Sequence, residues 1–291
     1  MRFSSSCLFL GWIALLFLST LAGLAQEAPS VLVWESAFES SENDEIRWPV
    51  AVAASGAEAV VADAFKSRLI FFQEEDVFRS QGNLRLQSTP VALAHDGDLW
   101  WLALRNGDLL TFRQFSDEPE KVALPTQVAL RPTVLAAWNG NVFVVDGDEK
   151  RVLRLSASGD IDREQGITDH VQALATDGST LFAALPVTGQ VRKYLPSSSE
   201  GTNWRIPGRK PRQAWPAALT LANENLYVAD RQGGRVLVLD TSGRVIGQGG
   251  RRGWDRGELL QPSAIAAFGD GRLAVADLGN SRVLVFRHLQ Q

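Results

Sequence analysis

The side chains best suited to metal or acid–base chemistry are few in this sequence of 291 residues, and they are scattered. Of its three histidines, His95 follows an apolar run, His170 precedes another, and His288 lies in the C-terminal tail. A metal centre needs several ligands converging on one ion. These positions are not equivalent, so the sequence predicts isolated histidines and assigns no metal ligand.

Two other motifs suggest ligand binding only weakly. The acidic turn at Asp146, Asp148 and Glu149 could attract calcium, but it lacks the spacing of a calcium-binding loop. The glycine-rich stretch 247–253 has Arg252 where a dinucleotide fingerprint needs glycine, and Pro262 and an apolar run follow it instead of a helix. No cofactor is therefore predicted, with calcium kept as a minor alternative, and no catalytic residue is assigned.

The most regular chemical pattern is an aspartate followed five residues later by an arginine. In LAVADLGNSRVLVFR, residues 273–287, Asp277 and Arg282 flank a polar turn between two apolar runs. An arginine can bind a carboxylate and backbone carbonyls together, which would fix the turn and the strand register. The same spacing recurs three more times, so we interpret all four pairs as structural: Asp63/Arg68, Asp146/Arg151, Asp230/Arg235 and Asp277/Arg282.

These pairs belong to a repeat that accounts for the fold. Six copies of an apolar run, a turn, a second run and a third run follow one another, and the residues ending their second runs lie 39 to 47 residues apart: Asp63, Leu104, Asp146, Leu185, Asp230 and Asp277. Leucine replaces the aspartate in two copies, which also lack the arginine. Six all-β copies at this period predict a propeller of six four-stranded blades.

The two ends of the chain are expected to complete one blade together. The last copy ends at its third strand, because only residues 287–291 remain. Residues 30–37 (SVLVWESA) form an apolar run that belongs to no copy. We expect this run to supply the outer strand of the last blade and so close the ring.

The pattern resembles the NHL-repeat family of β-propellers, here an exported bacterial-type member. The resemblance is strongest in VADLGNSRVLVF and in VADRQGGRVLVLDTSGRVIGQGG, and it extends over residues 48–286. It implies a six-bladed propeller. It does not imply one activity, because the family includes enzymes, sensors and scaffolds.

If a ligand binds, the residues just before each first strand are the predicted site, because loops converge there at the mouth of the central channel. Tryptophan and arginine are typical of binding hot spots. The alternative is that the tryptophans only pack between blades. The loop 251–254 and the segment 204–212 could extend this face. The candidate residues are Arg47, Trp48, Arg131, His170, Trp215 and Trp254.

The N-terminus resembles a secretory signal peptide. Arg2 precedes an uncharged apolar run from Cys7 to Ala25, with small residues at Gly23 and Ala25. An uncleaved membrane anchor is the alternative. We expect residues 1–25 to be a signal peptide and residues 26–291 to be one propeller domain, exported to the periplasm or beyond the cell. Cys7 is the only cysteine, so this domain can have no disulfide.

Composition and motifs together favour a binding protein over an enzyme. A net charge of −4 and export argue against nucleic-acid binding, including the RNA-binding role of some NHL propellers. We expect a monomeric scaffold for a protein, peptide or glycan, without a membrane span after cleavage. The alternative is a metal-dependent lactonase-type hydrolase or lyase with its site at the channel mouth. The chain is more consistent with a protein that is not an enzyme.

Overall fold

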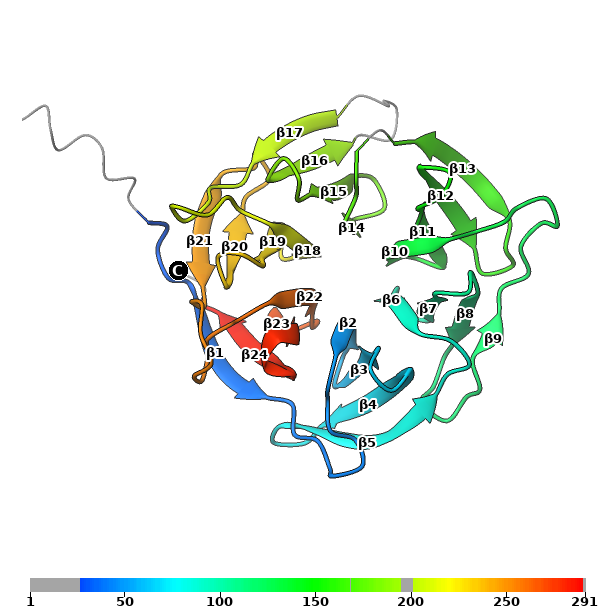
Figure 1. The fold of residues 1–291 in the computed structure, drawn as a ribbon, viewed down its shortest axis with the longest axis horizontal. Coiled ribbons are helices and arrows are strands. Elements are labelled where there is room, and N and C mark those ends of the chain that lie inside the picture. Colours follow the sequence, from blue (N-terminus) through cyan, green and yellow to red (C-terminus); the bar gives the residue numbers. More distant parts are fainter. Residues whose placement is uncertain (1–26, 168, 195–200, 290–291) are drawn as a thin grey trace, which may run out of the picture.

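A computed structural model describes residues 27–167, 169–194 and 201–289, in which six four-stranded antiparallel sheets form a ring (Figure 1). The all-β six-bladed fold is therefore confirmed. The expected signal peptide, residues 1–25, lies outside the described residues. Within those residues, no helix has the length and apolar character needed to cross a membrane.

The first three blades follow one another along the chain, each running from its inner to its outer strand. Blade 1 contains β2 (Pro49–Ser55), β3 (Glu58–Asp63), β4 (Arg68–Glu74) and β5 (Phe78–Arg85). Blade 2 contains β6 (Pro90–His95), β7 (Trp100–Leu104), β8 (Leu109–Phe112) and β9 (Glu120–Lys121). Blade 3 contains β10 (Pro132–Trp138), β11 (Asn141–Asp146), β12 (Arg151–Ser156) and β13 (Ile161–Gly166).

The remaining blades include the one that joins the chain ends. Blade 4 contains β14 (Ala173–Thr176), β15 (Leu181–Leu185), β16 (Gln190–Tyr194) and β17 (Gly201–Arg205). Blade 5 contains β18 (Pro216–Ala222), β19 (Asn225–Asp230), β20 (Arg235–Leu239) and β21 (Val245–Gly249). Blade 6 contains β22 (Pro262–Ala267), β23 (Arg272–Asp277), β24 (Arg282–His288) and, outermost, β1 (Leu32–Ala37), with a short 3₁₀ turn at Leu278–Asn280.

The hydrophobic core lies between the blades. Successive residues of a strand point to opposite faces of the sheet, so a strand covered on both sides must be apolar throughout. In β3, Val60 packs against blade 2 and Val61 packs against blade 6. Each pair of neighbouring blades shares one such buried cluster. This arrangement explains why the second and third strands of each repeat lack polar alternation.

The ring is closed by strands from both ends of the chain, as the sequence predicts. Strand β1 pairs with β24 in an antiparallel register that runs from Leu32 opposite His288 to Ala37 opposite Leu284. Figure 1 shows β1 outside β24, beside the outer strand of blade 5. The chain before β1 also follows blade 5, because the Val31 amide donates to the Gln248 carbonyl at 2.9 Å.

All connections from one blade to the next lie on one face of the ring. Each inner strand begins on this face, and the turn between the second and third strands of a blade returns to it. We call it the rim face. The turns from first to second strand and from third to fourth strand lie on the opposite face.

The four aspartate–arginine pairs lie at the rim face and are buried or nearly so. Arginine Nε lies 3.1 Å from Asp63 Oδ2 in blade 1, and the corresponding distances in blades 3 and 5 are both 3.2 Å. In blade 6 the distance from Arg282 to Asp277 is 3.6 Å, because Asn280 donates to the same Asp277 oxygen. The aspartate and arginine are direct cross-strand partners in every case.

Three of these arginines, Arg68, Arg235 and Arg282, also bind the connection that arrives from the preceding blade. Arg68 donates to the carbonyls of Asn43 and Glu45, which lie in the connection arriving from blade 6. Arg235 donates to the Pro207 carbonyl, and Arg282 donates to the carbonyls of Asp255 and Glu258. These arginines therefore tie the incoming chain to the hairpin of the blade that it enters, in addition to fixing the turn.

Blade 4 replaces the missing pair with a different ion pair. Leu185 and Gln190 occupy the aspartate and arginine positions. Arg192, two residues further along β16, instead binds Asp169 of the incoming connection at 2.5 Å. The connection is held to the third strand without the repeated motif, which explains how this blade can lack it.

The buried pairs should contribute unequally to stability. Arg68→Ala removes the partner of a fully buried carboxylate, so we expect the free energy of unfolding to fall by about 3–5 kcal/mol. Arg282→Ala should cost only about 1–3 kcal/mol, because Arg282 is more exposed and Asn280 still donates to Asp277. Urea unfolding would measure both, with the exposed Arg105→Ala as control. An Arg68 variant as stable as the control would contradict a structural role for the pair.

Candidate functional site

The central channel is narrow, and most of the residues that line it have apolar side chains. Near the rim face it has a volume of about 120 Å³, and near the opposite face about 290 Å³. All six inner strands line it, mainly with alanine, valine and leucine, as the crowding of strands at the axis requires. His95, Asp96 and Trp138 lie at the mouth on the opposite face.

The three histidines lie in three separate parts of the molecule. The His95 ring packs against the Trp100 ring in a tilted arrangement, with centroids 4.3 Å apart, at the opposite face. His170 is exposed at the rim face, on the connection into blade 4. His288 Nδ1 lies 2.7 Å from the Tyr227 hydroxyl at the end of β24. Across the described ranges, no three histidine, cysteine or acidic side chains form a group that could hold a metal ion.

The acidic turn of blade 3 borders a cavity of about 630 Å³ on the rim face, shared with His170. Asp146 is already bound by Arg151, and its other oxygen accepts the Arg131 amide at 3.3 Å. Asp148 forms an exposed ion pair with the Arg131 side chain at 3.1 Å. The structure thus places Arg131 and His170 together, in a site of mixed charge.

Two exposed aromatic residues are positioned by one buried carboxylate oxygen. Asp63 Oδ1 accepts the amide of Trp48 at 3.0 Å and the amide of Phe65 at 3.2 Å. The Trp48 side chain is 51 % exposed and that of Phe65 is 63 % exposed. Buried aspartate therefore fixes the backbone from which both aromatic rings project at the rim face.

A hydrogen-bonded path joins this pair to a third exposed aromatic residue. The Ser281 hydroxyl donates to the Arg47 carbonyl at 2.8 Å, and the Asn280 side chain donates to the Gly253 carbonyl at 3.0 Å. Trp254, which follows Gly253, is 73 % exposed. We call Trp48, Phe65 and Trp254 the aromatic arc; it spans blades 1 and 6 and the connection between blades 5 and 6.

The other candidate residues occupy different places. Trp215 is half-buried, its amide donates to Asp230 Oδ1 at 3.0 Å, and it lines a pocket beside blade 6. Of the segment 204–212, which the sequence suggested as an extension of the rim face, Arg212 lines this pocket and Trp204 does not contribute. Its side chain is buried on β17, where it packs against Phe182 with ring centroids 5.4 Å apart.

Sequence reasoning missed two exposed apolar residues of the rim face, Phe65 and Val187, which is 69 % exposed. Both lie in turns between second and third strands, whereas the site was predicted in the residues that precede first strands. The sequence does contain a signal for these two residues. Each turn begins directly after the repeated aspartate position, and that position lies at the rim face.

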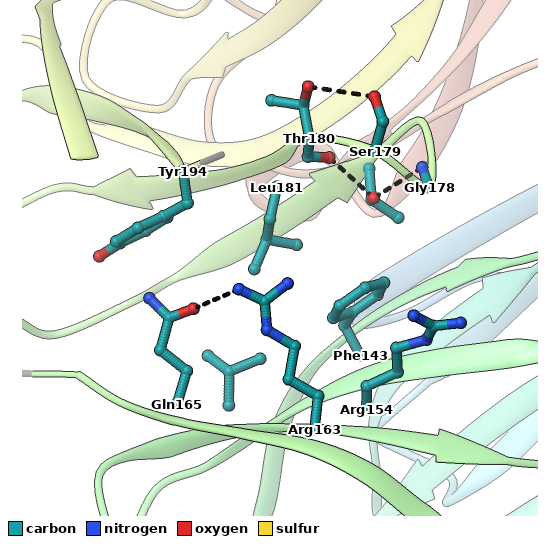
Figure 2. A pocket seen from close by; sticks show the side chains of 11 residues that line it. Phe143, Arg154, Arg163, Gln165, Gly178, Ser179, Thr180, Leu181 and Tyr194 are labelled. Carbon is teal, nitrogen blue, oxygen red and sulfur yellow. Dashed lines mark hydrogen bonds between the residues drawn. The ribbon is translucent and has the colours of Figure 1, made fainter. Parts of the chain in front are cut away.

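A cleft between blades 3 and 4 is too small to be the site (Figure 2). Its volume is about 20 Å³, which is room for a water molecule. On its blade 3 side, Arg163 donates to Gln165 of the same strand at 3.4 Å, and the Arg154 guanidinium lies 6.0 Å from the centre of the Phe143 ring. Both contacts lie within blade 3, and we assign them a structural role.

Comparison with known families identifies the repeat. A family model described as the NHL repeat matches residues 259–286, which cover β22, β23 and most of β24. The last blade of this six-bladed β-propeller thus contains a match to the NHL repeat. The matched segment contains the Asp277/Arg282 pair.

Solved structures share the fold at low sequence identity. A catalytically inactive histidine-to-alanine variant of virginiamycin B lyase from Staphylococcus aureus, crystallised with quinupristin, is 14 % identical, with a TM-score of 0.60 over 87 % of this chain and 84 % of that one. A structural-genomics protein of unknown function from Bacteroides thetaiotaomicron is 13 % identical, with a TM-score of 0.68 over 89 % and 73 %. These similarities establish the fold alone.

Two histidines should make the stability of this propeller pH-dependent. Burial lowers the pKa of His95 and of His288 below the ordinary value of about 6.5. In the unfolded chain both regain that value, so the unfolded state binds protons first as the pH falls. We expect the free energy of unfolding to decrease from pH 7.5 to 5.5 in urea titrations.

The double variant His95→Gln/His288→Gln tests the origin of this change. The variant should show a shallower decrease over the same range. Carboxylates with lowered pKa, such as Asp44, affect stability only at lower pH and do not interfere. An identical slope in variant and parent protein would contradict the assignment.

Proposed function

We propose that this propeller is an exported binding module that holds a protein, peptide or glycan partner on its rim face. The aromatic arc is the observation that carries the proposal. Its three side chains are between 51 % and 73 % exposed, although the backbone beneath Trp48 and Phe65 is held by buried Asp63. The signal-like N-terminus supports export, and the proposed compartment is the periplasm or the cell exterior.

The arc has the physical properties of a binding surface. Large aromatic side chains carry much of the energy of an interface once they are desolvated. A fixed backbone lowers the entropy lost on binding, so little ordering is needed when the partner arrives. The nearby Arg47 adds a directional hydrogen-bond donor, although in the free protein it pairs with Glu45 at 2.6 Å.

Removing two rings of the arc should abolish capture without unfolding the protein. The variant Trp48→Ala/Trp254→Ala should lose about 2 kcal/mol or more of binding free energy, a reduction of about thirtyfold or more. Immobilised protein would be exposed to a periplasmic extract and to a glycan array, and the bound material quantified. The melting temperature should hardly change, since both side chains are exposed.

Trp138→Ala is the matched control for this experiment. Trp138 is 48 % exposed but lies at the end of β10, on the opposite face of the ring. Its replacement should leave capture unchanged. If the Trp138 variant loses binding and the arc variant keeps it, the rim face is not the binding face.

A hydrolase or lyase is the second candidate, and one cavity favours it. The cavity of blade 3 brings His170, Asp148 and Asp169 together at the rim face. Separately, one solved protein of the same fold is named as a lyase. A histidine can serve as a general acid or base. This similarity extends only to the fold, so a lyase activity for this chain stays a proposal of lower rank.

Metal analysis of the purified protein would separate the two candidates. The enzyme proposal expects stoichiometric metal whose removal by a chelator lowers the melting temperature, and loss of any hydrolytic or lyase activity in His170→Ala. The binding proposal expects the melting temperature to be independent of chelator. If the protein contains bound metal and the arc variant still captures its partner, the enzyme proposal would rank above the binding proposal.

A further inference from the structure

A second pocket of the rim face lies between blades 5 and 6 and has a volume of about 430 Å³. Three segments that are distant in sequence form it: the connection into β18, the turn between β19 and β20, and the connection into β22. Each contributes one arginine, and the rest of the lining is aromatic or amide. The lining residues are Arg212, Trp215, Arg231, Gln232, Arg252 and Gln261.

Two of these arginines are held in place by the fold. The Arg231 side chain donates to Gln261 Oε1 at 3.1 Å, and its amide donates to the Trp215 carbonyl at 2.9 Å. The Arg252 side chain donates to the Leu260 carbonyl at 2.9 Å. Gly234 permits this packing, because a side-chain carbon there would lie 2.6 Å from Arg252 Cα. The pocket is therefore a built site.

The pocket carries positive charge without a compensating carboxylate. Some other arginines of the rim face are paired with acids, as Arg251 is with Glu258. Among the described residues, none of the three pocket arginines forms an ion pair, and no acidic side chain lines the pocket. Three guanidinium groups without an acidic partner in the described part of the chain therefore line one pocket, although the protein has a net charge of −4.

We infer that this pocket binds an anionic group, a phosphate, sulfate or carboxylate, carried on a sugar. Guanidinium groups match the oxygens of these anions with paired hydrogen bonds. Trp215 offers a flat apolar surface to the ring carbons, and Gln232 and Gln261 offer amides to hydroxyl groups. The inference rests on the proposed function of the rim face, and it defines the chemical class of one part of the ligand.

Saturation-transfer NMR on the purified protein tests the inference with four probes: glucose 6-phosphate, glucose 6-sulfate, glucuronic acid and neutral glucose. At least one acidic sugar should bind, and the three acids distinguish the anions. Glucose should bind at least about tenfold more weakly, as expected for loss of charge-assisted hydrogen bonds. Raising the salt concentration should weaken binding, because salt screens exposed charges.

The variant Arg231→Gln/Arg252→Gln should lower the affinity for the acidic sugar by about tenfold or more. Arg105→Gln is the matched control: Arg105 occupies the corresponding turn position in blade 2, is exposed, and lies on the same face. Its replacement should leave the affinity for the acidic sugar unchanged. Equal binding of glucose, no binding of any probe, or full binding by the double variant would overturn the inference.

Failure here can be distinguished from failure of the proposed function. If the acidic sugars do not bind but the variant Trp48→Ala/Trp254→Ala still loses its partner, the rim face is a binding face without an anion pocket. If the acidic sugars bind and the aromatic variant keeps its partner, the anion pocket exists and the arc is not the contact surface.

Discussion

The buried carboxylate at the end of a second strand is the constraint on which this molecule depends. In blade 1, one oxygen of Asp63 binds an arginine and the other binds the amides of Trp48 and Phe65. Leaving such a charge in the interior without partners would be strongly unfavourable. Turn geometry, attachment of the neighbouring blade and presentation of the rim face therefore all depend on the same side chain.

This dependence joins stability to function. The arginine that neutralises Asp63 also holds the connection arriving from blade 6 through the carbonyls of Asn43 and Glu45. The rim-face surface thus consists of short segments fastened to the rigid sheets beneath them. Blades that keep the pair carry the exposed tryptophans, whereas blade 4 fastens its connection through Arg192 and Asp169 instead.

The sequence predicted the architecture well because a repeat tests the same pattern six times. Apolar strands, the aspartate–arginine spacing and the unassigned N-terminal strand each follow from local periodicity. The surface was harder to predict: Trp204 and Trp254 both belong to polar, glycine-containing stretches, yet only Trp254 is exposed. The pocket of Arg212, Arg231 and Arg252 could not be found from spacing, because its members meet only when blades 5 and 6 pack together.

The shared last blade has a consequence for the order of events during synthesis. Strand β1 is synthesised before the other described strands, whereas its partner β24 is synthesised after them. Until then β1 has no partner in blade 6, and blades 1 and 5 each lack a neighbour on one side. The ring can close only once β24 has been synthesised, so the contacts of β1 in blade 6 form after the strands of the other five blades have been made.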